Sequence, residues 1–256
     1  MNLGLAGRGC VVTGAGDGIG RATAKLLGDE GASVLLVGRR GEALREVGPH
    51  WLALDITEPD AGERLVAECE DRFGSLDVLV NNAGTSSITP LEELSDDDWD
   101  EQWKLNVLGP MRLMRAAAPR MAERGWGRIV NVSSSSGKRP SVTNLAYSVA
   151  KAAELSLSRG FADAYAGKGV RVNAVAPGGV ETGLWMDEGG MADQLAAMRG
   201  VTRDEALAER RKAVPVGRMA TPEEIASVIV FLCSEAASYV AGSAWSVDGG
   251  VVQVII

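Results

Sequence analysis

The run Cys10-Val11-Val12-Thr13-Gly14-Ala15-Gly16-Asp17-Gly18-Ile19-Gly20 joins a short apolar strand to a glycine-rich turn. A helix is expected over residues 21–30, where apolar side chains recur at helical spacing until Gly31 ends it. Glycines in such a turn let a pyrophosphate approach the backbone at the helix N-terminus, where free N–H groups favour anions. The alternative is a plain connecting turn. Because the turn directly follows the first strand, we favour the nucleotide-binding interpretation.

Strand-like and helical segments alternate along the rest of the chain, which predicts an α/β fold with a parallel sheet. The expected strands are 10–13, 33–37, 52–54, 76–80, 128–132, 170–175 and 243–247. Helices are expected for about ten residues from 41, at 60–73, from Ser95 to about 121 with a kink at Pro110, around Tyr147, and from 221. Residues 183–214 lose this regularity and are rich in Met, Gly and charge, so this segment is a candidate mobile substrate lid. We expect a single domain over residues 1–256.

Composition excludes several classes of function. The chain has 256 residues and a net charge of −8, which argues against a nucleic-acid-binding surface. His50 is the only histidine and the three cysteines match no ligand spacing, so we expect neither histidine-based catalysis nor a metal site. Residues 1–9 contain no apolar run, and no later stretch is long enough to span a membrane. We therefore expect a cytoplasmic protein without a membrane segment.

A second group of residues has spacings that suggest chemistry. The run Ser133-Ser134-Ser135-Ser136-Gly137 precedes Tyr147, and Lys151 follows Tyr147 by four residues. Residues i and i+4 share one face of a helix, and an ammonium beside a phenol favours the phenolate. Such a phenol can pass a proton to or from an alcohol oxygen near neutral pH. Alone the spacing is weak, because a helical Tyr usually packs and a helical Lys is usually solvated.

Polar and glycine-rich segments also follow the other expected strands, where ligands bind in parallel sheets. They are Gly38-Arg39-Arg40, Asp55, Asn81-Asn82-Ala83-Gly84, and Ala176-Pro177-Gly178-Gly179-Val180-Glu181-Thr182. No acidic residue ends the second strand to hold the adenosine ribose, so Arg39 either faces a 2′-phosphate or is solvated. Asp17 lies in the glycine turn, on the adenosine side, and would repel such a phosphate.

Together these motifs resemble the short-chain dehydrogenase/reductase family over essentially the whole chain. The matching segments are Thr13-Gly14-x-x-x-Gly18-Ile19-Gly20, Asn81-Asn82-Ala83-Gly84, Ser134, Tyr147-x-x-x-Lys151, Pro177-Gly178 and Ser246-Val247-Asp248-Gly249-Gly250. The resemblance implies one Rossmann-like, doubly wound domain with a parallel seven-stranded sheet flanked by helices. It also implies a homotetramer and a small carbonyl or alcohol substrate, with neither nucleic acid nor membrane as a partner.

The resemblance assigns roles to individual residues. Tyr147 resembles the general acid/base, Lys151 the residue that binds the nicotinamide ribose and tunes the phenol, and Ser134 the hydroxyl that polarises the carbonyl. Asn106, in an unfavourable mid-helix position, resembles the residue that holds a water in a proton relay. The implied cofactor-binding residues are Gly14, Gly16, Asp17, Gly18, Ile19, Gly20, Arg39, Asp55, Ile56, Asn82, Ala83, Gly84, Tyr147, Lys151, Pro177, Gly178, Val180 and Thr182.

Several functional alternatives stay open. Gly38-Arg39 favours NADP(H), and NAD(H) is the alternative. The substrate is either a 3-oxoacyl thioester, for which Arg128 and Lys168 stand at carrier-facing positions, or a polyol, sugar or cyclic alcohol. Lys138 and Arg139 would lie near the substrate mouth or be solvated loop charges. A hypothesis of another class is a non-catalytic nucleotide-sensing protein on this fold.

Overall fold

The strand that precedes the glycine turn lies inside a parallel sheet of seven strands in the order β3-β2-β1-β4-β5-β6-β7. This computed structural model describes residues 3–253. The strands are β1 (Gly9–Thr13), β2 (Ser33–Gly38), β3 (Trp51–Ala53), β4 (Val78–Asn81), β5 (Gly127–Val132), β6 (Val170–Pro177) and β7 (Ala244–Val247). All residues of β1, β4 and β5 are buried, as expected for parallel strands covered on both faces.

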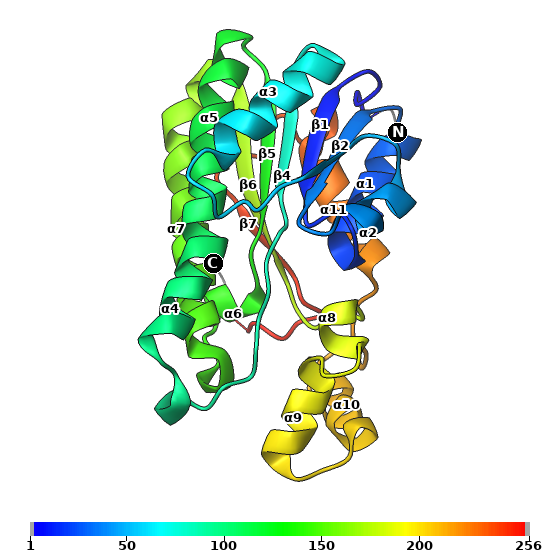
Figure 1. Cartoon of the computed structure of the whole chain (residues 1–256), viewed down its shortest axis with the longest axis vertical. Helices are drawn as coiled ribbons and strands as arrows, with labels where there is room; N and C mark the ends of the chain where they lie inside the picture. The colour runs from blue at the N-terminus through cyan, green and yellow to red at the C-terminus, as the bar shows by residue number, and fades with distance from the viewer. Residues whose placement is uncertain (1–2, 254–256) are drawn as a thin grey trace.

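Helices cover both faces of the sheet, so side chains that alternate along each strand enter two different cores (Figure 1). Val11 and Leu79 pack under α3 (Ala61–Phe73), α5 (Gly109–Glu123) and α7 (Leu145–Tyr165). Val12 and Val80 pack under α1 (Gly18–Asp29), α2 (Gly41–Val47) and α11 (Pro222–Cys233). The prediction of a seven-stranded, doubly wound sheet is confirmed. Within residues 3–253, no helix has the length and apolar character needed to cross a membrane.

The helix expected from Ser95 to about 121 forms over residues 96–123 as an unbroken helical run. Ser95 caps its first part, α4 (Asp96–Trp103), in a reciprocal capping box, and a π-helical turn (Lys104–Leu108) joins α4 to α5. Pro110 lies in the first turn of α5, directly after the π-helical turn. That turn is the feature that the sequence did not predict. The helix expected for about ten residues from residue 41 is shorter, because α2 has 7 residues.

The candidate lid is more ordered than its sequence indicates. It forms α8 (Gly183–Met186), α9 (Met191–Arg199) and α10 (Arg203–Lys212), which Figure 1 shows as a group apart from the sheet, facing α4 and the short α6 (Ser135–Lys138). Two small apolar clusters hold this group together, and neither belongs to the two cores that cover the sheet. Short amphipathic helices with many charged residues leave little periodic signal, which explains the loose pattern.

Candidate active site

A cavity of about 1030 Å³ opens at the carboxyl ends of the strands. Its lining includes most of the residues expected to bind a cofactor or to act in catalysis. These are Gly14, Gly16, Asp17, Gly18, Ile19, Arg39, Asp55, Ile56, Asn82, Ala83, Gly84, Ser134, Tyr147, Lys151, Pro177, Gly178, Val180 and Thr182. Gly20 and Asn106 are the two expected residues that do not line it. Gly20 is buried inside the glycine turn, where it packs against Gly14.

The glycine turn is fastened to the segment after β4. The Thr13 hydroxyl accepts hydrogen bonds from the backbone N–H groups of Asn82 and Ala83, both at 3.0 Å. The Asn82 side-chain amide in turn donates to the Thr13 carbonyl at 2.9 Å. Gly14 has φ +66°, and a Cβ there would lie 2.8 Å from Asn82 Nδ2. Only glycine therefore fits this close approach, and Gly14, Gly16 and Gly18 line the cavity at the N-terminus of α1, which fits a pyrophosphate.

The hydroxyl, phenol and ammonium predicted from spacing come together at this cavity. Ser134 caps the N-terminus of α6, and its Oγ accepts the Ser136 N–H at 3.1 Å. Ser133 is different, because its Oγ donates to the Lys151 carbonyl at 3.0 Å and holds β5 against α7. Tyr147 and Lys151 follow on α7, with Lys151 Nζ 5.9 Å from the centre of the Tyr147 ring. Ser134, Tyr147 and Lys151 all line the cavity.

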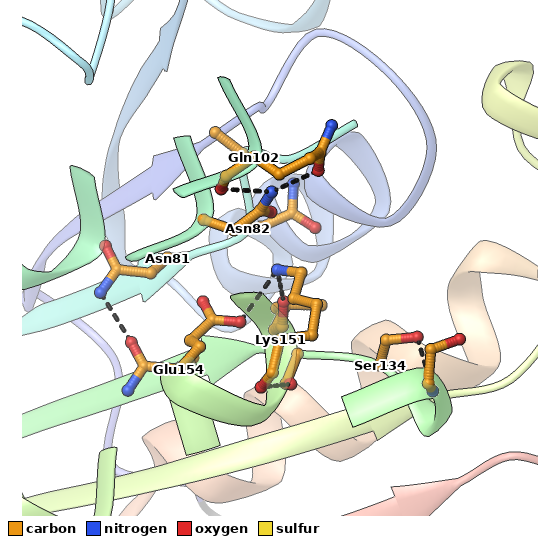
Figure 2. A network of polar contacts seen from close by, with 12 residues as sticks. Asn81, Asn82, Gln102, Ser134, Lys151 and Glu154 are labelled. Atoms are coloured by element: carbon orange, nitrogen blue, oxygen red, sulfur yellow. Dashed lines mark hydrogen bonds and ion pairs between the residues drawn. The ribbon is translucent and has the colours of Figure 1, made fainter. Parts of the chain in front are cut away.

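Lys151 has a buried acidic partner that the sequence reading missed. Its Nζ donates to Glu154 Oε2 at 2.9 Å, as Figure 2 shows. It also donates to the Val132 carbonyl at 2.8 Å. The side chains of Lys151 and Glu154 are only 3% and 1% exposed. The signal was available in the i, i+3 spacing of the two residues, but burial of that helix face was not deduced.

Burial sets the protonation of this pair. Burial raises the pKa of the Glu154 carboxyl to about 7, although Lys151 opposes the shift. Burial alone would lower the pKa of the Lys151 ammonium, but Glu154 and the Tyr147 phenol outweigh it and raise that pKa. The ammonium is therefore retained throughout the neutral range, while Glu154 changes charge within it.

Asn106 lies behind the cavity wall, in the π-helical turn. It is fully buried, and its amide donates to Gln102 Oε1 at 2.9 Å and to the Gln102 carbonyl at 3.2 Å. Its Oδ1 is buried and unpaired within residues 3–253. A Cβ built on Gly84 would lie 3.1 Å from this oxygen and 3.7 Å from Lys151 Nζ. An unpaired acceptor near the ammonium fits a bound water or ligand hydroxyl.

Gly38, Arg39 and Asp55 line the part of the cavity where the adenosine is expected. A backbone hydrogen bond from Thr57 is the main cause that lowers the pKa of Asp55, and the charge of Arg39 adds to it. Asp17 was expected on this side, and that expectation was wrong. A Cβ on Gly183, where α8 begins, would lie 2.5 Å from Asp17 Oδ2, so the carboxylate faces the lid.

Two further expectations about basic residues are corrected. Lys138 Nζ donates to the Ala244 carbonyl at 2.7 Å and to Ser246 Oγ at 2.9 Å, so it is tied to β7 instead of facing the mouth. Arg128 was a candidate carrier-facing residue, but it is 3% exposed and ion-paired with Glu235 at 3.3 Å. Arg139 is exposed and lies outside the cavity lining.

The part of the cavity beside the lid has apolar walls. Leu184 and Trp185 of α8 line it. Ile88, Met191, Leu195 and Arg210 were not expected, because only the folded lid brings α9 and α10 over the loop that follows β4. Among residues 3–253, no group of His, Cys, Asp and Glu side chains has the arrangement of a metal site.

Comparison with known proteins gives consistent matches. A family model described as enoyl-(acyl carrier protein) reductase matches residues 14–252. The chain is 41% identical to cis-4-hydroxycyclohexanecarboxylate dehydrogenase of Sinomonas cyclohexanicum, over 99% of this chain and 100% of the relative. It is 33% identical to 3-oxoacyl-[acyl-carrier-protein] reductase of Aquifex aeolicus, over 98% and 100%. L-sorbose reductase from Gluconobacter frateurii, solved with NADPH and L-sorbose, superposes with a TM-score of 0.91 at 35% identity, covering 100% of both chains.

The fold, the cavity and these matches agree. The chain belongs to the short-chain dehydrogenase/reductase family, a family of oxidoreductases that interconvert alcohols and carbonyl compounds with NAD(P). The alternative of a non-catalytic nucleotide-sensing protein finds no support among these relatives, which are named as dehydrogenases and reductases.

Proposed function

We propose that this enzyme interconverts a ketone and a secondary alcohol, with Tyr147 as the general acid/base. The observation that carries the proposal is that Ser134, Tyr147 and Lys151 line the same cavity as the glycine turn. A dinucleotide and its hydration are supported by the glycine turn, whose Gly14, Gly16 and Gly18 line the cavity, and by the unpaired Oδ1 of Asn106. When bound, the nicotinamide supplies the hydride that reduces the carbonyl carbon, or accepts it in the reverse reaction.

The residues of this chain would supply everything except the hydride. Ser134 Oγ donates a hydrogen bond to the substrate oxygen and polarises the C=O bond. Tyr147 gives its phenolic proton to that oxygen as negative charge develops on it, and takes a proton back when an alcohol is oxidised. Lys151 stabilises the phenolate through its charge and binds ribose hydroxyls. Asn106 Oδ1 accepts from a water that returns the proton from solvent.

For the cofactor, we propose a preference for NADP(H), supported by Arg39 in the cavity lining and by the NADPH in the sorbose reductase complex. At equal concentrations, turnover with NADP(H) should exceed turnover with NAD(H). Faster turnover with NAD(H) would overturn this assignment. The Asp17 charge does not oppose a 2′-phosphate here, because its carboxylate faces the lid.

Replacing Gly38 with Asp should reverse the cofactor preference. A Cβ at this position meets its nearest neighbour, Leu44 Cδ2, at 3.5 Å, so the side chain fits without rearrangement. The new carboxylate would accept ribose hydroxyls and repel a 2′-phosphate, and we expect kcat/KM with NADPH to fall about 100-fold while that with NADH rises. Gly28→Asp adds the same charge at an open, exposed position of α1. It should leave the ratio of kcat/KM with NADPH to kcat/KM with NADH unchanged.

For the substrate, we propose a cyclic or otherwise compact secondary alcohol or ketone. Ile88, Trp185 and Leu195 form apolar walls suited to a ring, and one relative is named for a hydroxycyclohexanecarboxylate. A 3-oxoacyl thioester is the second candidate, favoured by the name of the Aquifex relative. Burial of Arg128 removes one carrier-facing charge and weakens that candidate. Steady-state rates on a panel of cyclic ketones, polyols and a 3-oxoacyl thioester distinguish the two.

We further propose that the chain is one dinucleotide-binding domain in which residues 183–214 move as a lid. The Ile88 backbone N–H donates to Gln194 Oε1 at 2.9 Å, which ties α9 to the loop after β4. Amide hydrogen exchange in α9 and α10 should slow several-fold when NADPH and a substrate analogue are bound together, while exchange in β1 stays constant. Equal exchange rates with and without ligands would contradict a moving lid.

We also propose a cytoplasmic homotetramer. The edge strand β7 carries Trp245, which is 36% exposed against Phe231, and Tyr239 nearby is fully exposed. Apolar side chains at a sheet edge support assembly. Cys10, Cys69 and Cys233 are all buried free thiols, as suits a reducing compartment. Light scattering of the purified protein measures the assembly directly.

A further inference from the structure

One arginine of the lid faces the cavity without an acidic partner. Arg210 lies on α10, lines the cavity, and places its guanidinium carbon 5.3 Å from the centre of the Trp185 ring. Its Nε is buried and has no hydrogen-bond partner within residues 3–253. A Cβ on Gly179, in the loop after β6, would lie 3.1 Å from that Nε and 3.4 Å from Nη2. The guanidinium is therefore held between the lid and the loop after β6.

The acidic residue next to Arg210 in the sequence and the one in the loop after β6 are already engaged. Glu209 pairs with Arg199 at 2.6 Å, and Glu181 pairs with Arg211 at 3.1 Å. In the part of the chain that the structure describes, no carboxylate pairs with Arg210. Burial lowers the pKa of the Arg210 guanidinium, and the charge of Arg199 lowers it further, so its neighbours do not compensate its charge. A half-buried cation that no carboxylate pairs with is stabilised when a ligand brings an anion to it.

The cavity around Arg210 favours one kind of anion. A guanidinium presents a planar pair of donors that matches a carboxylate, and its contact with the Trp185 ring and with the loop at Gly179 limits its movement. The walls contributed by Ile88 and Leu195 are apolar and suit a hydrocarbon ring. A pyrophosphate is expected instead at the glycine turn, whose Gly14, Gly16 and Gly18 line the cavity, with Arg39 near the adenosine.

We propose that Arg210 binds a carboxylate on the substrate, so that this enzyme acts on a ketone or secondary alcohol whose apolar body carries an acid group. The proposal rests on the proposed function for the reaction itself and adds the chemical class of the substrate. Tyr147 and Ser134 would hold the reacting oxygen, and Arg210 would hold the acid group at the lid. Substrates that lack the acid would leave the guanidinium unpaired beneath the closed lid.

A binding experiment tests the proposal independently of turnover. Cyclohexanecarboxylate and cyclohexanecarboxamide are titrated calorimetrically into the full-length enzyme saturated with NADP⁺. We expect the carboxylate to bind at least about tenfold tighter than the amide, and Arg210→Met to remove that difference. Arg210→Lys should keep a part of it, because the charge remains while the planar fork is lost. Arg211→Met removes the same charge from the neighbouring exposed position and should change neither affinity.

Kinetics separate failure of this proposal from failure of the proposed function. With 4-oxocyclohexanecarboxylate, Arg210→Met should raise KM about 10- to 100-fold and change kcat little, whereas 4-oxocyclohexanecarboxamide should be reduced equally by both proteins. Equal binding of acid and amide by the wild-type enzyme overturns the carboxylate assignment, even if both ketones are reduced. If Arg210→Met lost affinity for NADPH while its binding of the acid stayed unchanged, Arg210 would contact the cofactor. That result would also overturn the carboxylate assignment. Tight binding of the acid without reduction of any ketone overturns the proposed function alone.

Discussion

Tyr147→Phe is expected to lower kcat for ketone reduction by about 10³-fold while leaving the affinity for NADPH within about twofold of wild type. The substitution removes one oxygen atom and keeps the ring in place beside Lys151 and Ser134. Without the phenol, no proton donor is in position to neutralise the oxygen as it receives negative charge. Stopped-flow oxidation of NADPH measures the rate, and quenching of NADPH fluorescence measures the affinity.

The same helix provides a matched control for this substitution. Tyr165, at the end of α7, stacks on Phe161 with ring centres 6.0 Å apart and lies outside the cavity lining. Tyr165→Phe should therefore keep the wild-type rate. If Tyr147→Phe retained more than about a tenth of the rate, another group would have to supply the proton and the proposed role would be wrong.

Lys151→Met is expected to reduce both activity and stability, and the loss of stability should depend on pH. The ammonium is the only partner described for the buried carboxyl of Glu154 within residues 3–253, so its removal leaves a buried acid without compensation. Removing one member of such a pair costs about 3–5 kcal/mol when the other is charged. We expect a loss of this size in the free energy of unfolding at pH 8, together with at least about a 100-fold loss of kcat/KM.

The sign of the pH dependence follows from the raised pKa of Glu154. Its carboxyl titrates near 7 in the folded enzyme against an ordinary value of 4.5, and loss of Lys151 moves the folded value higher still. A carboxyl whose pKa is higher in the folded protein than in the unfolded chain stabilises the folded protein at low pH. This stabilisation is lost as the pH rises from the pKa of the unfolded chain through that of the folded protein. Lys151→Met should therefore be less destabilised at pH 5 than at pH 8. Urea unfolding followed by circular dichroism at the two pH values measures the difference.

A double variant separates the two losses. In Lys151→Met/Glu154→Leu the buried acid is gone, and well-packed apolar residues commonly replace a buried ion pair without loss of stability. We expect most of the free energy of unfolding to return at pH 8, with the pH dependence removed and the activity still absent. The Val132 carbonyl lacks its partner in both variants, so it does not affect the comparison. If the double variant were as unstable as the single one, the charge of Glu154 would not be the cause.

The parts of the fold predicted from the sequence are those that local pattern determines. The strand, glycine turn and helix around Gly14 depend on neighbours in the chain, and so do the strands of the sheet, whose apolar runs are nearly continuous. The π-helical turn before Pro110 was not predicted, because the periodicity of apolar residues does not distinguish a single π turn from an α-helix. Asp17 was misplaced because its neighbour Gly183 is distant in sequence.

The partners of two residues of the site could not be predicted from the sequence. Glu154 reads as an ordinary helical acid, and only the burial of one face of α7 against β5 makes it the partner of Lys151. Arg210 stands in a run of charged residues on α10, where its neighbours Glu209 and Arg211 form ion pairs. Its contact with Trp185 arises only when α8 and α10 fold together. In both cases the partners come from tertiary packing, which residue spacing alone does not specify.

The separate apolar clusters of the lid have an evolutionary consequence. Ala192 and Leu207 pack in one of them, Leu195 and Ala206 in the other, and none of the four belongs to a core of the sheet. Substitutions in α9 and α10 therefore change the shape and charge of the substrate chamber at little cost to the sheet. We therefore expect changes in this short segment to alter the substrate range without disturbing the folding of the sheet. Exchanging residues 183–214 between relatives should accordingly transfer substrate range and leave the melting temperature largely that of the recipient.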